Sequence, residues 1–495
     1  MAMDYVDCKL TILDEEQTLY SDRFRPDPIS GRIRDDQDGD TLVRDTIERL
    51  DAWVASDDRD ITRDDLELLG RHLYYFLFDD KIRNGFEQTY QGFRQSPDKN
   101  ARLRLVLAFH EEAKRIASYP WEFLFMPTRK NSPGFFLCAE KRTELILTRL
   151  VPESSLADKL FPEETSLKIL VVFANPRELR SPLHPEKFLE QISSTKRVDV
   201  EIMTEETNRE ALTKDGLERE LRRFKPHIFH FIGHGDAAKG VALMKTAHEV
   251  QEHYDATGET RDAEWVDSRA LSRLFPDPPP RLVFLHACDG AAASSLKGFN
   301  STAHALVYSY DVPAVVAMQY VITNESAALF AKTFYQQIAD GKPIDIAVSE
   351  GRWALRQSRG GEFADRGFGT PLVYLQNESA IILHQIDEEE EGETHVPCPY
   401  GCGGRVFAGN SVCGKCVRPL TICEQGHVMA AGSKACPQGH PARDAGVARA
   451  TALSAPHESQ VETGRGGSAP ELLQPVPEPA GSDPLRTTYD EAKKG

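Results

Sequence analysis

The chain of 495 residues is 40% hydrophobic and carries 59 Lys and Arg against 77 Asp and Glu, a formal net charge of -18. This length accommodates roughly two to four structural units. The acidic balance repels polyanions, so nucleic acid is not expected as the main partner. No stretch approaches the ~20 apolar residues of a membrane-spanning helix, and the opening MAMDYVDCKL has no signal-peptide pattern, so we expect no membrane association and a cytoplasmic location.

The first third of the chain changes from helical to strand-like patterning. Residues 40–94 place apolar side chains three to five positions apart, which predicts helices. Residues 102–110, RLRLVLAFH, begin with the alternation of a strand, and shorter strands are predicted at 120–125 and 135–137. We expect residues 1–165 to form a mixed α/β region that packs against the later part of the chain.

From residue 166 onward, short apolar runs alternate with charged helical segments. In chain order the runs are SLKILVVFAN, VDVEIMTEE, PHIFHFIGHG, PRLVFLHACDG and PAVVAMQYVI. Apolar runs separated by helices are typical of a buried, mostly parallel sheet. We therefore predict an α/β domain over residues 166–385, with its functional groups at the carboxyl ends of the strands.

Two of these strand ends carry chemically active side chains. The run HIFHFI leads to Gly233-His234-Gly235, and RLVFLHA leads to Cys288-Asp289-Gly290. A cysteine attacks an amide carbonyl as a thiolate, which requires an imidazole to take the proton and N–H donors to hold the oxyanion. His234 and Cys288 are therefore the candidate catalytic pair, and the main-chain amides of Gly235 and Cys288 are the candidate oxyanion hole.

The alternative interpretation of this pair is a turn histidine and a buried core thiol. The order of the two residues, histidine first and cysteine 54 positions later, favours catalysis. Caspases have the same order, with the histidine about 50 residues upstream. His230 and His286, which lie within the strands, are expected to have packing roles.

A cysteine-rich segment follows an acidic run near the end of the chain. The unit C-x-x-G-[C/H] occurs three times, and each glycine permits a tight turn that points two ligands at one metal ion. The predicted ligands of one ion are Cys398, Cys402, Cys413 and Cys416, and those of the other are Cys423, His427, Cys436 and His440. Closed four-ligand sites are usually structural, so we expect two structural zinc ions and no catalytic cofactor.

These features divide the last part of the chain into three segments. Residues 386–397 are predicted to be an acidic linker, and residues 398–442 a double zinc ribbon. Residues 443–495 are rich in Pro, Gly, Ser, Ala and Glu, which predicts a disordered tail.

Several of these motifs resemble a known family. HFIGHGD and LVFLHACDGA resemble the two signature motifs of the CHAT domain, a relative of caspases, separase and gingipains, and PWEFLF and GFFLCAEKRTELILTRLVP resemble its leading half. The resemblance covers about residues 95–385. It implies a caspase-like fold, with His234 as base or ion-pair partner and Cys288 as nucleophile. By comparison with Arg-cleaving relatives, Asp289 favours a basic residue before the scissile bond, unless it points to solvent.

The motifs together predict a regulated cysteine endopeptidase that cuts a specific partner protein or itself. By analogy with the family, we expect a role as an effector in bacterial defence or conflict, including antiviral defence. We also expect a substrate that is encoded nearby and an activating partner that docks on the zinc ribbon. One alternative is a catalytically silent CHAT scaffold that binds partners through the ribbon. Another is a zinc-ribbon nucleic-acid binder, which the acidic balance disfavours. Residues 239–264 are expected to form a loop that becomes ordered on activation.

Overall fold

The structure is a computed structural model. It describes residues 5–25, 27–33, 41–56, 61–95, 101–127, 134–140, 145–151, 166–179, 192, 195–236, 238–287, 299–358, 361–377, 380–383, 395–401, 405–407, 418–423, 425, 427–436 and 439–441. The chain divides into units 1–448 and 449–495, and the second unit lies wholly outside the described residues, as does the predicted tail. The predicted acidic linker is described only at residues 395–397.

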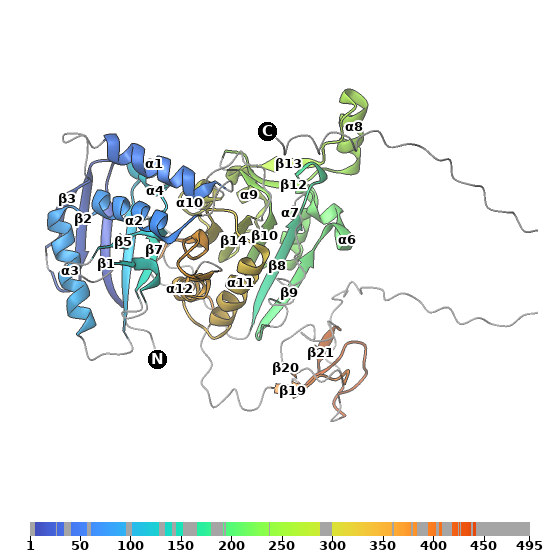
Figure 1. Cartoon of the computed structure of the whole chain (residues 1–495). Coiled ribbons are helices and arrows are strands. Elements are labelled where there is room, and N and C mark those ends of the chain that lie inside the picture. Colours follow the sequence, from blue (N-terminus) through green and yellow to red (C-terminus); the bar gives the residue numbers. More distant parts are fainter. Residues whose placement is uncertain are drawn as a thin grey trace, which may run out of the picture. The chain divides into compact units, whose positions relative to one another are not determined.

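An 11-stranded sheet forms the centre of the fold, in the order β3-β2-β1-β4-β7-β18-β15-β14-β10-β8-β9 (Figure 1). Its strands are β1 (Tyr5–Ile12), β2 (Gln17–Asp22), β3 (Ile29–Arg32), β4 (Arg102–Phe109), β7 (Ile146–Leu150), β8 (Leu167–Ala174), β9 (Val198–Met203), β10 (Ile228–Gly233), β14 (Leu282–Ala287), β15 (Ala314–Met318) and β18 (Pro371–Leu375). Seven of its ten pairings are parallel, and only β1–β2, β2–β3 and β15–β18 are antiparallel. The predicted mostly parallel α/β sheet is confirmed.

Helices cover the sheet on both sides, and β10 illustrates how. Alternate residues of a strand point to opposite faces. His230 contacts Tyr335 of helix α11 (Asn324–Ala339), whereas its neighbour Phe229 packs against Phe275, which follows helix α9 (Ser268–Leu274). Every residue of β10 is consequently buried, which explains why its sequence is apolar apart from His230.

The helices of the first third agree with the predicted patterning. Residues 40–94 form α1 (Thr41–Ala55), α2 (Arg63–Leu77) and α3 (Asp80–Arg94). Further along the chain are α4 (Lys114–Ala117), α6 (Glu205–Asn208), α7 (Lys214–Phe224), α8 (Ala247–Thr257), α10 (Asn300–Ser309) and α12 (Ile344–Leu355). Across the described ranges, no helix combines the length and the apolar character that crossing a membrane requires.

The strand predicted at residues 120–125 is wrong for its first half. Residues Trp121–Phe123 form a 3-10 helix, and only Phe125–Met126 form a short strand, β5, which pairs with β6 (Phe135–Phe136). The tight turn exists because the Phe123 N–H donates to the Pro120 carbonyl and the Trp121 indole N–H donates to the Ile116 carbonyl. This turn also directs Glu122 into the interior.

Glu122 is the centre of a buried ionic network. Its side chain is fully buried and pairs with Arg149, which is also fully buried. Its Oε1 lies 3.5 Å from Nη2 of Arg352, and its Oε2 accepts a 2.8 Å hydrogen bond from Gln319. A buried carboxylate needs such partners to offset its desolvation. The network joins the early segment, through Glu122 and Arg149, to residues of the later one, and both segments contribute to one hydrophobic core.

The loop predicted at residues 239–264 is instead regular structure. β11 (Gly235–Asp236), β12 (Gly240–Met244) and β13 (Ala263–Val266) form a three-stranded antiparallel sheet, with α8 inserted between β12 and β13. All five residues of β12 are buried, and such complete burial is incompatible with a solvated loop. The polar composition that suggested a loop belongs mainly to α8, which has no buried residue.

Candidate functional site

Three neighbouring parallel strands end at the same edge of the sheet. Gly233, the last residue of β10, is in register with Ala174 of β8 on one side and with Ala287 of β14 on the other. The residues that follow these three in the sequence are His234, Asn175 and Cys288. Cys288 and Asp289 lie outside the described residues. The described part of the edge is therefore the histidine, its asparagine neighbour, and the strand that leads to the cysteine.

The His234 imidazole is oriented by Asn175. The His234 side chain is 2% exposed, and its Nε2 lies 3.1 Å from Oδ1 of Asn175. An amide oxygen only accepts hydrogen bonds, so Nε2 carries the proton and Nδ1 is the basic nitrogen. Asn175 was not among the predicted site residues, although it ends the run SLKILVVFAN at the edge where functional groups were expected.

Burial determines the charge of this histidine. It lowers the pKa of His234 to about 4, because the charged imidazolium loses its hydration in the interior. At neutral pH the imidazole is therefore neutral in the described environment. A neutral imidazole with a basic Nδ1 is able to take a proton from a thiol.

The backbone on both sides of His234 is held in place. The Ala242 N–H of β12 donates a 3.0 Å hydrogen bond to the His234 carbonyl. Gly235 pairs with Val241, and a Cβ atom on Gly235 would lie only 2.0 Å from the Phe299 ring. Only glycine fits at this position, which explains the Gly235 next to the histidine. Its amide as an oxyanion donor stays a prediction, and the Cys288 amide lies outside the described residues.

The two strand histidines have packing partners. The His230 ring stacks on Phe284 at a centroid distance of 4.1 Å, and its Nδ1 lies 2.7 Å from the Tyr335 hydroxyl. His286 is buried, and its ring centroid lies 6.0 Å from that of His230. Both side chains belong to the aromatic layer between β10, β14 and α11, as packing roles require.

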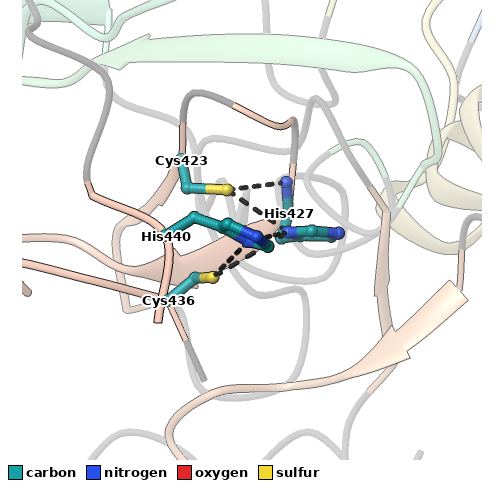
Figure 2. Close-up of side chains that lie close together, drawn as sticks. All are labelled: Cys423, His427, Cys436 and His440. Carbon is teal, nitrogen blue, oxygen red and sulfur yellow. Dashed lines mark hydrogen bonds between the residues drawn. The ribbon is translucent and has the colours of Figure 1, made fainter. Parts of the chain in front are cut away.

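The Cys/His segment contains a candidate metal centre (Figure 2). Ligand atoms of Cys423, His427, Cys436 and His440 all lie within 4.8 Å of one another. The two histidine Nδ1 atoms are 3.1 Å apart, and the sulfur to Nδ1 distances that join the two types of ligand are 3.4 to 3.8 Å. A tetrahedral zinc ion separates its ligand atoms by about 3.3 to 3.8 Å. The four residues thus fit one such ion.

Glycine turns are described in two of the three repeated units, one of them in this centre. Gly439 has φ +85°, and its N–H donates to the Cys436 carbonyl at 2.8 Å. Gly401 repeats this geometry, with φ +69° and a 2.9 Å hydrogen bond to the Cys398 carbonyl. The positive φ explains the glycine in these two units.

Two small hairpins accompany these turns. β19 (His395–Pro397) pairs with β20 (Arg405–Phe407), and β21 (Leu420–Ile422) pairs with β22 (Val428–Ala430). Of the first predicted ligand set only Cys398 is described, since Cys402, Cys413 and Cys416 lie outside the described residues.

Comparison with known proteins identifies the family. Residues 67–387, more than half of the chain, match the CHAT domain. The match begins earlier than the resemblance at about residue 95 suggested, and so includes most of α2 and all of α3. No match was found among curated proteins.

Among solved structures, the chain is similar to a chain of the Saccharomyces cerevisiae separase–securin complex determined at 3.0 Å. The sequence identity is 13% and the TM-score is 0.40, and the similarity covers 75% of this chain and 30% of that chain. In the 2.6 Å structure of that complex the identity is 14% and the TM-score 0.31, over 67% of this chain and 20% of the other. The chain spans less than a third of the length of either. The match over residues 67–387 shows that the chain belongs to the CHAT domain family.

Proposed function

We propose that this CHAT-family chain is a cysteine endopeptidase in which Cys288 is the nucleophile and His234 is the general base. The observation that carries the proposal is the register at the edge of the sheet. Gly233 and Ala287 are paired in register at the ends of two adjacent parallel strands. His234 directly follows Gly233 in the sequence, and Cys288 directly follows Ala287. The neutral His234 imidazole, with its Nε2–H directed to Asn175, supports the role of a base that acts through Nδ1.

The proposed reaction proceeds through an acyl-enzyme. The Cys288 thiol gives its proton to His234 Nδ1, and the thiolate forms a C–S bond with the carbonyl carbon of the scissile amide. The amides of Gly235 and Cys288 hold the oxyanion. His234 then donates the proton to the leaving amine as the C–N bond breaks. A water molecule, deprotonated by His234, hydrolyses the thioester and restores the thiol.

The proposed substrate is a specific partner protein, or the chain itself. Asp289 directly follows the nucleophile in the sequence, so its carboxylate favours a basic residue before the scissile bond. We further propose that the protein acts in the cytoplasm as an effector of a bacterial defence or conflict system. Both the role and a substrate encoded nearby are inferred by analogy with the family.

The zinc ribbon is proposed to hold two structural zinc ions. The fit of Cys423, His427, Cys436 and His440 to a tetrahedral ion supports the second ion, and the glycine turn after Cys398 supports the first. A ribbon held in this way is the proposed docking element for an activating partner. Closed four-ligand sites leave no position for a substrate, so the zinc ions have no role in the cleavage itself.

The proposal is tested by co-expressing the chain with the proteins that neighbouring genes encode. New protein termini identified by mass spectrometry should appear with the wild type and disappear with Cys288→Ala and with His234→Ala. Cys138→Ala is a matched control, because Cys138 is a buried cysteine outside the site. Intact partners with the wild type would support the alternative, a silent scaffold that binds partners through the ribbon.

A further inference from the structure

We infer that the β12–β13 hairpin holds His234 and Asn175 in their relative positions, and that Asp262, at the base of this hairpin, is a positioning residue for the catalytic histidine. The inference rests on the proposed function and extends it to a residue that acts through the histidine. Its basis is that β12 and Asp262, the residue before β13, contact the backbone at or next to each member of the His234–Asn175 pair.

The first contact is made by β12. Its Ala242 N–H donates a 3.0 Å hydrogen bond to the carbonyl of His234 itself. The neighbouring residue of β12, Val241, pairs with Gly235. Because every residue of β12 is buried, this strand provides a fixed support for the backbone that carries the imidazole.

The second contact is made at the start of β13. The Arg177 N–H donates a 2.7 Å hydrogen bond to Asp262 Oδ1, and the Ala263 N–H donates a 3.3 Å hydrogen bond to Glu178 Oε1. Arg177 is separated from Asn175 by one residue, Pro176, whose ring restricts the backbone. The carboxylate of Asp262 therefore anchors the turn that begins at Asn175.

Asp262 is buried and has a cationic partner. Asp262 is 1% exposed, and its Oδ2 lies 3.5 Å from Nη2 of Arg209. The carboxylate is thus held by one hydrogen bond from a backbone N–H, at Oδ1, and by the charge of the guanidinium near Oδ2, which has no hydrogen-bond partner of its own among the described residues. Its position is consequently well defined, as a positioning residue requires.

A main-chain hydrogen bond closes the hairpin between the two contacts. The Lys245 N–H, at the end of β12, donates to the Asp262 carbonyl at 2.8 Å. The same backbone segment thus reaches His234 on one side and the Asn175 turn on the other. Loss of the Asp262 side chain releases the turn, and Asn175 then no longer fixes the proton on His234 Nε2. The fraction of imidazole with a basic Nδ1 directed at the thiol falls as a result.

The experiment measures the rate at which iodoacetamide alkylates Cys288 as a function of pH, in the full-length protein, with mass spectrometry of the peptide that contains Cys288. Asp262→Ala should shift the alkylation profile by about one pH unit toward the alkaline side and lower kcat for the co-expressed substrate about tenfold without a change in KM. Asp262→Asn, which keeps an acceptor for the Arg177 N–H, should retain most of the wild-type behaviour. Asp255→Ala, on exposed α8, is the control without effect.

A wild-type alkylation profile in Asp262→Ala would overturn the inference. If His234→Ala also leaves the profile unchanged, the proposed function fails; if only Asp262→Ala does so, the inference alone fails. Where Asp262→Ala does not fold, as judged by circular dichroism, Glu178→Ala replaces it. That variant removes the acceptor of the Ala263 N–H, so it should shift the profile in the same direction, and no shift would overturn the inference.

Discussion

The Nε2 atom of His234 lies 3.1 Å from Oδ1 of Asn175, and the two residues follow the paired strand ends Gly233 and Ala174. The imidazole is thus held by a side chain from the next strand. In the proposed mechanism this contact leaves Nδ1 as the atom that exchanges a proton with Cys288. In that mechanism the asparagine determines which nitrogen of the base carries the proton, and burial keeps the ring neutral.

Substitution of Asn175 should impair the proposed cleavage without loss of the fold. Asn175→Ala removes the acceptor of the Nε2–H, and misorientation of a catalytic group costs up to about 100-fold in rate. We expect kcat to fall about 10- to 100-fold. Asn175→Asp keeps the acceptor and adds a negative charge, which raises the pKa of His234 and moves the acidic limb of the rate profile to higher pH. Unchanged kcat in Asn175→Ala would show that the contact has no catalytic importance.

The strand pattern was the most predictable part of the fold. Runs such as that of β10 are apolar except for His230, because they lie between helices on both faces, and this pattern is visible in the sequence. β1 to β3 were not predicted. In β1 buried and half-buried residues alternate, since one face of this strand is less covered. The sequence pattern of this strand is short and includes charged residues, so it does not resemble a buried apolar run.

Three-dimensional contacts decide what the sequence could not predict. Asn175 acquires its role only from the register of β8 with β10, which lies more than fifty residues further along the chain. In the sequence Glu122 is only a charge within an apolar segment, and the tight turn at Trp121–Phe123 is what directs it at Arg149. The cluster of Cys423, His427, Cys436 and His440 could be anticipated from the sequence, because each of its two Cys/His pairs lies within five consecutive residues.

The buried network around Glu122 should contribute strongly to stability. Glu122→Gln leaves Arg149 and Arg352 buried without their carboxylate, and removal of one partner from a buried ion pair costs about 3–5 kcal/mol. We expect this loss in the free energy of unfolding measured by denaturant titration. Glu362→Gln removes the exposed partner of Arg356 and should cost less than about 1 kcal/mol. Equal losses in the two variants would contradict the assignment.

Buried histidines should make the protein sensitive to acid. Burial lowers the pKa of His286 and of His304 from 6.5 to about 4. The unfolded chain therefore takes up protons at these residues between about pH 6.5 and 4, where the folded protein does not. The stability that the neutral rings contribute is complete above pH 6.5 and is lost as the pH falls toward 4.

His304→Phe tests this dependence at one residue. The new ring keeps the contacts with Tyr308 and Tyr374 but does not titrate. The slope of unfolding free energy against pH, measured between pH 6 and 4.5, should decrease by about 1 kcal/mol per pH unit. His248→Gln, at an exposed histidine of α8, should leave the slope unchanged. An unaltered slope in His304→Phe would show that this ring is accessible to protons in the folded state.

The ribbon should bind two zinc ions per chain. Native mass spectrometry should detect both, and Cys423→Ser or His427→Ala should remove one, because these residues belong to a single four-ligand cluster. Chelation should unfold the ribbon, since metal binding and folding are coupled in such modules. Cys138→Ser, outside the ribbon, should retain both ions. A single ion in the wild type would mean that the first predicted ligand set is wrong.

Activation of Cys288 by His234 is best tested by the pH dependence of Cys288 alkylation in the wild type and in His234→Ala. An ordinary cysteine has a pKa of about 8.5, and a cysteine paired with an imidazole reacts at lower pH. We predict that wild-type Cys288 reacts with iodoacetamide well below pH 8, and that His234→Ala moves the profile to that of an ordinary thiol. An ordinary profile in both proteins would contradict the proposed pairing of the two residues.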